Sequence, residues 1–196
     1  MAILPGSRPA PLDDALRDGA IVLALGGNLA GDYPSLEALL EAAVSAFRGA
    51  GLRIARRSGW WRSAAWPDPA QPAYLNGAVL VETALGPREL LNAVHELESA
   101  FGRARTVENA SRTLDIDLIA YGRQVIDAPG LTVPHPRAHE RLFVMGPLAE
   151  IAPDWAHPTL GLTAAALART ATVGRDARPY SDPTRRNVET GQSGET

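Results

Sequence analysis

The chain has 196 residues, of which 45% are hydrophobic and 21% charged, so it can build one core of ordinary size. Its formal net charge of −3 gives no support to nonspecific binding of a nucleic-acid backbone. It contains no cysteine, and all 19 of its basic residues are arginine. These absences exclude disulfides, cysteine-bound zinc, lysine Schiff bases and a phosphate loop ending in Gly-Lys-Ser/Thr. Any phosphate must therefore be bound by arginine.

The two ends of the chain differ in composition from its middle. Residues 1–19 are rich in Pro, Arg and Asp, and residues 171–196 in Thr, Gly, Ser, Asp and Arg, without apolar periodicity. We expect flexible tails there and a single domain at residues 20–170. The sequence shows neither a secretory signal nor an apolar stretch as long as a membrane span, which predicts a cytoplasmic protein.

The first half of the predicted domain contains three strands and a helix. Ala20 to Gly26 is a short apolar run that predicts a buried strand followed by a glycine turn. From Pro34 to Phe47, apolar residues recur at helical spacing. Two segments with β-branched and aromatic residues, separated by a proline-rich loop, then predict an antiparallel pair of strands at Leu52–Trp66 and Tyr74–Thr83.

A second helix is predicted to begin at Pro87 and end at Gly102, and a fourth strand covers Leu114 to Tyr121. The order strand, helix, strand, strand, helix, strand is the β-α-β-β-α-β pattern of ferredoxin-like sheets. We therefore expect an α/β fold of the α+β kind, with helices packed on one face of the sheet and a C-terminal extension. Fold alone names no activity.

Two aspartates interrupt the apolar fourth strand. Asp115 and Asp117 stand two positions apart, so on a strand they share a face. Burying two like charges is costly unless a cation neutralises them, and magnesium prefers carboxylate and phosphate oxygens. A magnesium-nucleotide site is one interpretation. In the other, Leu114, Ile116 and Leu118 face the core while the aspartates lie on a wet outer face.

A segment from Gly102 to Ser111, containing arginines, leads into this strand. The guanidinium groups of Arg103, Arg105 and Arg112 suit bidentate binding of phosphate oxygens and stabilisation of a transferring phosphoryl group. A solvated basic loop is the alternative interpretation.

Further along the chain, His135 stands between two prolines and Arg141 follows, at a distance that can return both to the same edge of the sheet. A second group has the composition of a site for a flat ring, in which aromatic side chains stack and an amide reads the polar edge. Core packing is the alternative interpretation for Tyr74 and Phe143. The group comprises Trp66, Tyr74, Asn76 and Phe143.

Together, these motifs resemble the 6-hydroxymethyl-7,8-dihydropterin pyrophosphokinases from about Ala20 to about Ala168. The resemblance implies a ferredoxin-like fold and ATP-dependent pyrophosphokinase (diphosphotransferase) activity in folate biosynthesis. In this family the hydroxymethyl oxygen attacks the β-phosphorus of ATP, giving AMP and the pterin diphosphate. The matching stretches are Leu25-Gly26-Gly27-Asn28-Leu29, Gln71-Pro72-Ala73-Tyr74-Leu75-Asn76, Gly102-Arg103-Ala104-Arg105, Arg112-Thr113-Leu114-Asp115-Ile116-Asp117, and Val133-Pro134-His135-Pro136 with Arg141 and Phe143.

The resemblance also implies roles for individual residues. Asp115 and Asp117 would hold two Mg²⁺ ions, and the catalytic set would be Arg103, Arg112, Asp115 and Asp117. The residues expected to bind ATP, the co-substrate, are Glu98, Arg105, Leu118, His135 and Arg141. The residues expected to bind the pterin are Gly26, Ser63, Trp66, Tyr74, Asn76 and Phe143.

We expect a monomer whose partners are the small molecules ATP and hydroxymethyldihydropterin, with no nucleic-acid or membrane partner. An RNA-binding ferredoxin-like module is a rival interpretation, because such sheets can present aromatic side chains to bases. The basic and aromatic signature of those modules is missing here. A third interpretation is a former enzyme retained as an interaction domain, and the complete set of aspartates and arginines argues against it.

Overall fold

The computed structural model describes residues 18–65, 70–102 and 113–181. None of the helices in these ranges is long and apolar enough to cross a membrane. In chain order the elements are β1 (Ile21–Gly27), α2 (Leu36–Ala46), the 3-10 helix η1 (Phe47–Ala50), β2 (Arg53–Arg57), β3 (Trp61–Ser63), β4 (Tyr74–Glu82), α3 (Pro87–Ala100), β5 (Asp115–Tyr121), β6 (Ile126–Ala128), β7 (Leu131–Val133), the 3-10 helix η2 (Ala138–Glu140), α4 (Leu142–Ile151), α5 (Ala164–Thr170) and β8 (Arg178–Pro179).

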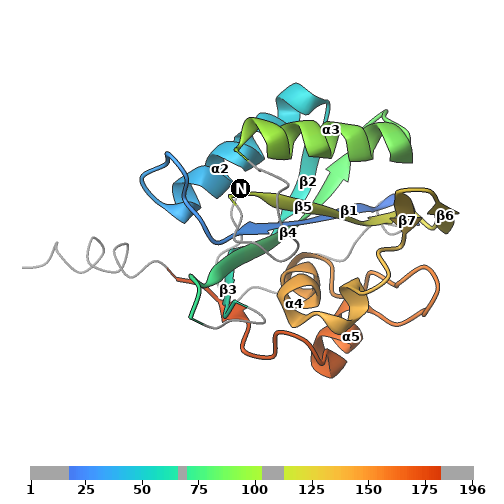
Figure 1. Ribbon diagram of the computed structural model, residues 1–196. Coiled ribbons are helices and arrows are strands. Elements are labelled where there is room, and N and C mark those ends of the chain that lie inside the picture. The colour runs from blue at the N-terminus through green and yellow to red at the C-terminus, as the bar shows by residue number, and fades with distance from the viewer. Residues whose placement is uncertain (1–17, 66–69, 103–112, 182–196) are drawn as a thin grey trace, which may run out of the picture.

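An antiparallel sheet separates two layers of helices (Figure 1). Its strand order is β5-β1-β4-β3-β8, and β2 pairs with the second half of β4. β1 lies between β4 and β5 and is buried along its whole length, because apolar clusters cover both of its faces. The predicted β-α-β-β-α-β order and the ferredoxin-like fold are confirmed. β6 and β7 form a separate hairpin.

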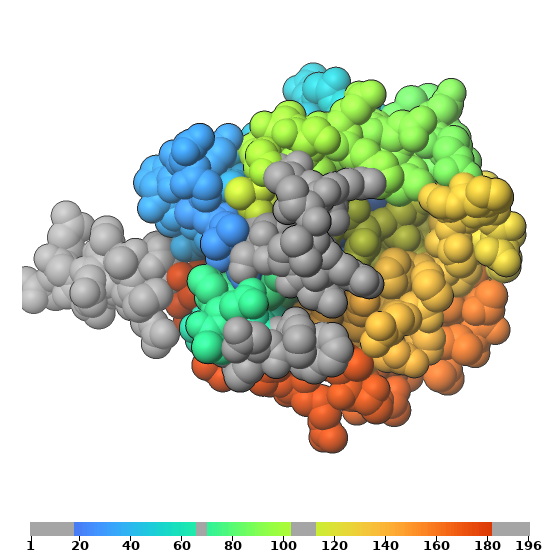
Figure 2. All heavy atoms as spheres, in the orientation of Figure 1, coloured from blue at the N-terminus to red at the C-terminus, as the bar shows by residue number. Residues whose placement is uncertain are grey.

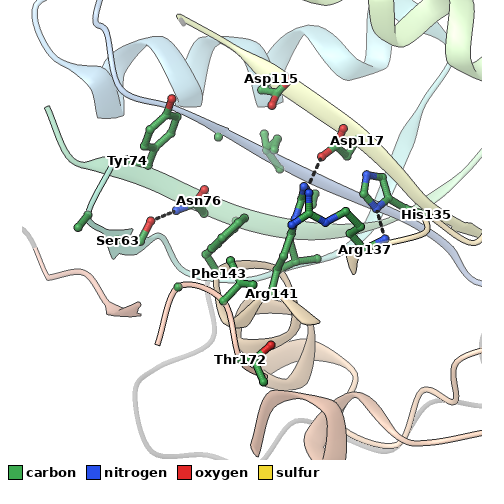
Figure 3. Close-up of a pocket in the computed structure, with 18 residues that line it drawn as sticks. Ser63, Tyr74, Asn76, Asp115, Asp117, His135, Arg137, Arg141, Phe143 and Thr172 are labelled. Atoms are coloured by element: carbon green, nitrogen blue, oxygen red, sulfur yellow. Dashed lines mark hydrogen bonds and ion pairs between the residues drawn. The ribbon is translucent and has the colours of Figure 1, made fainter. Parts of the chain in front are cut away.

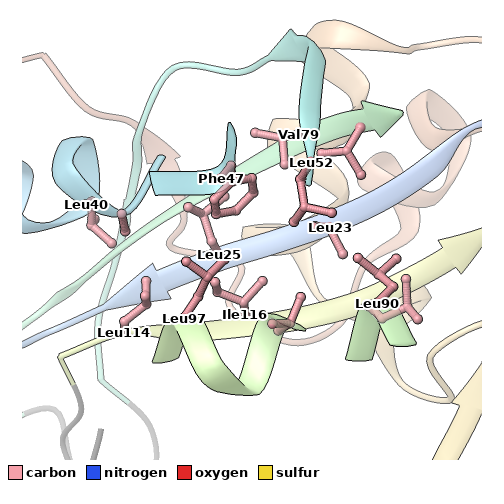
Figure 4. Packing of buried hydrophobic residues seen from close by; sticks show 14 of the residues in the cluster. Leu23, Leu25, Leu40, Phe47, Leu52, Val79, Leu90, Leu97, Leu114 and Ile116 are labelled. Atoms are coloured by element: carbon pink, nitrogen blue, oxygen red, sulfur yellow. The ribbon is translucent and has the colours of Figure 1, made fainter. Parts of the chain in front are cut away.

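Helices α2 and α3 cover one face of the sheet with a continuous apolar core (Figure 4). The N-cap residue Ser35 starts α2 by accepting a hydrogen bond from the N–H of Ala38 at 3.1 Å. Pro87 occupies the first turn of α3, where its missing N–H costs nothing. Burial of each large apolar side chain here stabilises the folded state by roughly 1.5–3 kcal/mol. The largest are Leu23, Leu39, Leu40, Phe47, Leu52, Leu90 and Leu114.

The opposite face is covered by α4 and α5, which belong to the C-terminal extension (Figure 1). The extension packs on this face through a second apolar cluster around Met145, Leu148 and Trp155. Both faces of the sheet are therefore covered by helices. In the space-filling view, α3 lies along the top of the molecule, while the orange and red C-terminal residues form the bottom (Figure 2).

The segment predicted as one strand at Leu52–Trp66 contains two strands in its described part. β2 and β3 both pair with β4, and residues 58–60 separate them. The interruption has a specific cause on the neighbouring strand: the hydroxyl of Ser58 accepts the N–H of Ala78 at 2.9 Å. A side-chain oxygen thus occupies the place of a backbone carbonyl in the ladder.

Part of the predicted C-terminal tail packs on the domain. Val173 forms a parallel bridge with Arg141, and β8 pairs with β3 at the sheet edge. The N–H of Tyr180 donates to the carbonyl of Trp60 at 2.8 Å. Residues 171–181 therefore have backbone partners that composition alone did not indicate.

Candidate active site

Three neighbouring strands place Asp115, Gly26 and Asn76 in one row across the sheet. Gly26 lies between the other two, and a Cβ on it would stand 2.7 Å from the carbonyl oxygen of Leu75 and 2.8 Å from the amide oxygen of Asn76. Glycine is required at this position because no side chain fits there. The row consequently has the carboxylate of Asp115 at one end and the amide of Asn76 at the other, with no side chain between them.

Asp115 and Asp117 line a cavity of ≈ 550 Å³ on the face that α4 partly covers (Figure 3). Strand alternation sends Leu114 and Ile116 into the opposite apolar core, as predicted. The guanidinium Nη1 of Arg141 lies 3.7 Å from Oδ2 of Asp117 across the cavity, and their side chains are 23% and 37% exposed. The aspartates share a face, as predicted, and that face borders a cavity beside a cation.

Residues from other elements complete the cavity wall. The amide Nδ2 of Asn76 donates to Oγ of Ser63 at 3.1 Å, which fixes the orientation of the amide. Figure 3 shows Tyr74 and Asn76 on the sheet and Phe143 at the start of α4. The guanidinium carbon of Arg141 lies 5.8 Å from the centre of the Phe143 ring. The structure therefore brings an amide and two aromatic rings to the cavity that the aspartates line.

His135 stands at one end of this cavity. The backbone N–H of His135 donates to the carbonyl of Ile119 at 2.9 Å. The ring Nδ1 of His135 accepts the backbone N–H of Arg137 at 3.2 Å. A neutral imidazole that accepts through Nδ1 carries its proton on Nε2. Burial lowers the pKa of His135, Asp117 acts in the opposite direction, and Arg141 lowers the pKa further.

A second cavity, of ≈ 360 Å³, follows the outer edge of β5 between α3 and β7. It contains Glu98 and Leu118, two residues predicted for the nucleotide site. Glu98 is buried, and its Oε1 accepts the N–H of Ile116 at 2.7 Å, which ties α3 to β5. The residues that line both cavities are Asp115, Asp117 and His135.

Four of the predicted site residues lie outside the described residues: Trp66, Arg103, Arg105 and Arg112. The structure also adds cavity residues that the sequence did not indicate. Arg137 follows the proline-flanked histidine, a position from which it could have been suspected. Thr172, Val173 and Gly174 come from the segment after α5 and carry no motif.

The donor set at this site fits a hard divalent cation. Among the described residues, no cluster of three His, Asp or Glu side chains is placed to hold a metal ion. Two carboxylates on one strand face are nevertheless the usual protein share of a Mg²⁺ site, because water and substrate phosphates supply the other ligands.

Comparisons with known proteins identify relatives of this chain. The family model described as 7,8-dihydro-6-hydroxymethylpterin-pyrophosphokinase matches residues 22–153. A 2-amino-4-hydroxy-6-hydroxymethyldihydropteridine pyrophosphokinase of Synechocystis is 42% identical over 154 residues, which cover 79% of this chain and 77% of the relative. One of Methylorubrum extorquens is 42% identical over 134 residues, covering 67% and 82%.

Among solved structures, wild-type HPPK-DHPS of Plasmodium falciparum has a similar fold, with a TM-score of 0.59 at 14% identity. The alignment covers 76% of this chain and 40% of that longer chain. The chain thus spans less than half of that solved protein, but most of the Synechocystis relative. The chain belongs to the 7,8-dihydro-6-hydroxymethylpterin-pyrophosphokinase family.

Proposed function

We propose that this chain transfers the pyrophosphoryl group of ATP to 6-hydroxymethyl-7,8-dihydropterin in folate biosynthesis. The products are AMP and the pterin diphosphate. Family membership supports this activity, and one feature of the structure carries it: two cavities meet at Asp115, Asp117 and His135. Transfer of a pyrophosphoryl group between two substrates requires two adjacent binding sites, with polar residues where the sites meet.

The pterin is assigned to the larger cavity. Tyr74 and Phe143 offer ring faces there, and Asn76 offers an oriented amide to the polar edge of a heterocycle. Gly26 leaves the floor of the cavity open between Asn76 and Asp115. Ser63 orients the amide, and we extend the proposed pterin set to Trp66, as the sequence predicts.

The nucleotide is assigned to the cavity at the outer edge of β5. Leu118 and Leu91 of α3 offer apolar surface to the base, while Glu98 holds β5 in place. The triphosphate then points toward His135 and Arg141, near the shared aspartates. A guanidinium group in this position suits phosphate oxygens. We place Arg105 in the same set.

Asp115 and Asp117 would hold the magnesium ions of the reaction, two by family resemblance. When bound, Mg²⁺ would neutralise the negative charge of the phosphate oxygens. The contribution of the chain is to place the two carboxylates on a rigid strand whose alternate residues are locked in the core.

The chain then acts by positioning and by charge stabilisation. The hydroxymethyl oxygen of the pterin forms a bond to the β-phosphorus and releases its proton. The bond from the β-phosphorus to the oxygen that bridges to the α-phosphorus breaks, and AMP leaves with the electron pair. We propose that Arg141, whose guanidinium lies beside Asp117, stabilises this charge together with Arg103 and Arg112. No covalent intermediate with the protein is required.

The test is an assay with ATP, MgCl₂ and 6-hydroxymethyl-7,8-dihydropterin, followed by chromatographic identification of the nucleotide product. AMP and a pterin diphosphate in equal amounts are expected. ADP instead of AMP would contradict pyrophosphoryl transfer, and absence of any pterin product would contradict the proposed substrate. Omission of the pterin is the control for ATP hydrolysis.

A further inference from the structure

The segment after α5, which we define as the strap (residues 172–176), is attached to the start of α4. The N–H groups of Thr172 and Val173 donate to the carbonyl of Glu140 at 3.0 and 2.9 Å. The N–H of Leu142 donates to the carbonyl of Val173 at 2.9 Å. These bonds involve Glu140 and Leu142, the two neighbours of Arg141, and Phe143 is the next residue. The strap therefore runs beside the backbone of Arg141 and Phe143.

The other end of the strap is attached to the opposite wall of the cavity. A carboxylate oxygen of Asp176 accepts the N–H of Ala64, the residue after Ser63. The bond from the N–H of Ala177 to the carbonyl of Gly174, 2.9 Å long, closes a turn that contains Asp176. β8 then pairs with β3. The strap thus connects the α4 wall of the larger cavity to its β3 wall.

Gly174 is the point at which the strap meets the Phe143 ring. Its φ is +66°, a conformation that glycine adopts without strain. A Cβ on this residue would overlap Cδ1 of the ring and stand 3.0 Å from Cε1. Any larger residue must displace the ring, and Phe143 itself lines the cavity. The ring position therefore depends on the absence of a side chain at residue 174.

We infer that the strap is a positioning element of the pterin site, with Gly174 setting the position of Phe143 and Asp176 holding the β3 wall. The inference rests on the proposed function, because it assigns the larger cavity to the pterin. Neither residue need touch the substrate. Each acts through a side chain or backbone group that lines the cavity.

The chain offers a matched control for Gly174. Gly161 has the same φ of +66°, but a Cβ there would have no neighbour within 4 Å. Gly161→Ala and Gly174→Ala therefore introduce the same backbone strain, and they differ in the contact with Phe143. Gly174→Ala should raise the KM for the pterin about tenfold, the upper range for a disturbed aromatic contact. The KM for ATP should change by less than about twofold, and Gly161→Ala should leave both constants within about twofold.

A double-mutant cycle distinguishes positioning from general destabilisation. In a Phe143→Ala background, Gly174→Ala should change the KM for the pterin by less than about twofold, because the ring is gone. A tenfold change in that background would overturn the assignment, as would equal effects of Gly174→Ala and Gly161→Ala. Thermal denaturation of each variant verifies folding.

Asp176→Ala tests the other attachment and serves if Gly174→Ala does not fold. It should raise the KM for the pterin about threefold without a change in the KM for ATP, since one exposed hydrogen bond to the backbone is lost. Unchanged pterin kinetics in this variant would contradict the role of the strap at β3. Failure of the wild-type chain to form AMP would instead contradict the proposed function, so the two failures are distinguishable.

Discussion

The two faces of the sheet are built from alternating residues of the same strands, yet they differ in what covers them. Against α2 and α3, the strands present large side chains such as Leu23, Leu25 and Ile116 along their whole length. Against α4, they present small or acidic residues toward one end, among them Gly26 and Asp115. The helix covers only part of that face, and the remainder is the larger cavity.

This difference separates stability from activity within single strands. Substitutions of side chains that face α2 and α3 and line neither cavity, such as Leu23, should lower the free energy of unfolding without changing substrate constants. Substitutions of polar side chains in the cavity should do the reverse, because polar residues at its surface have few packing contacts. The four predictions that follow test this separation.

The largest expected effect is on turnover. Asp117→Ala should lower kcat on the order of a hundredfold to a thousandfold, the range for loss of a charge-stabilising group. The temperature of unfolding should stay within a few degrees of wild type. Steady-state formation of AMP and thermal denaturation measure the two quantities. Asp127→Ala, at an exposed aspartate of β6, is the matched control and should have wild-type kinetics. Full activity of Asp117→Ala would contradict the metal assignment.

The largest effect on stability is expected on the other face. Phe47 is only 1% exposed, and Phe47→Ala should lower the free energy of unfolding by about 3–5 kcal/mol. Urea titration measures this change, while the KM values of the folded variant should equal those of wild type. Val125 is 65% exposed, so Val125→Ala should change stability by less than about 0.5 kcal/mol. A changed pterin KM in Phe47→Ala would show that the faces are coupled.

The layer that contains α4 and α5 should respond to acid through His157. Burial, together with the charges of His139 and Arg123, lowers the pKa of this residue to about 4. Between pH about 6.5 and about 4, the unfolded chain binds a proton that the folded chain does not. The free energy of unfolding therefore decreases as the pH is lowered through this range, by up to about 3 kcal/mol.

Urea titrations across this pH range measure the effect. In the His157→Asn variant, the amide oxygen can replace the ring nitrogen that accepts the N–H of Leu160 at 3.3 Å. That variant should lose the part of the pH dependence that His157 contributes. An identical pH dependence in variant and wild type would assign the effect to other groups.

The smallest of the four effects compares two glycines. Gly26→Ala should lower the free energy of unfolding by about 1–3 kcal/mol, because its methyl group meets two oxygens of β4. It should also weaken pterin binding, since it fills the floor of the cavity. Gly49→Ala places its methyl group in open space and should stabilise the chain by about 0.4–1 kcal/mol. Chemical denaturation and titration with the pterin check both variants.

Sequence reasoning succeeded where the determining interactions are local. The alternation around Asp115 and Asp117 fixes which residues face the core, and the sheet confirmed it. Likewise Gly102, with φ +79°, follows α3 at the predicted end. In both cases a few consecutive residues contain the whole signal.

Sequence reasoning failed where a residue depends on a distant partner. The strand break at residues 58–60 follows from a bond between Ser58 and Ala78, which lie 20 positions apart. The role of Gly174 depends on Phe143, and its surroundings in sequence are those of an ordinary polar tail. Roles for Trp66, Arg103, Arg105 and Arg112 remain predictions, since these positions lie outside the described residues.

The short strand β8 has a consequence for self-association. It closes the edge of the sheet opposite β5 with two residues, one of which, Pro179, has no N–H to offer. Such an edge resists the addition of a strand from another molecule, which is how many sheet proteins begin to aggregate. A chain shortened before Arg178 would leave β3 with an unprotected row of backbone donors and acceptors. Arg178 and Pro179 therefore shield this edge of the sheet from pairing with another molecule.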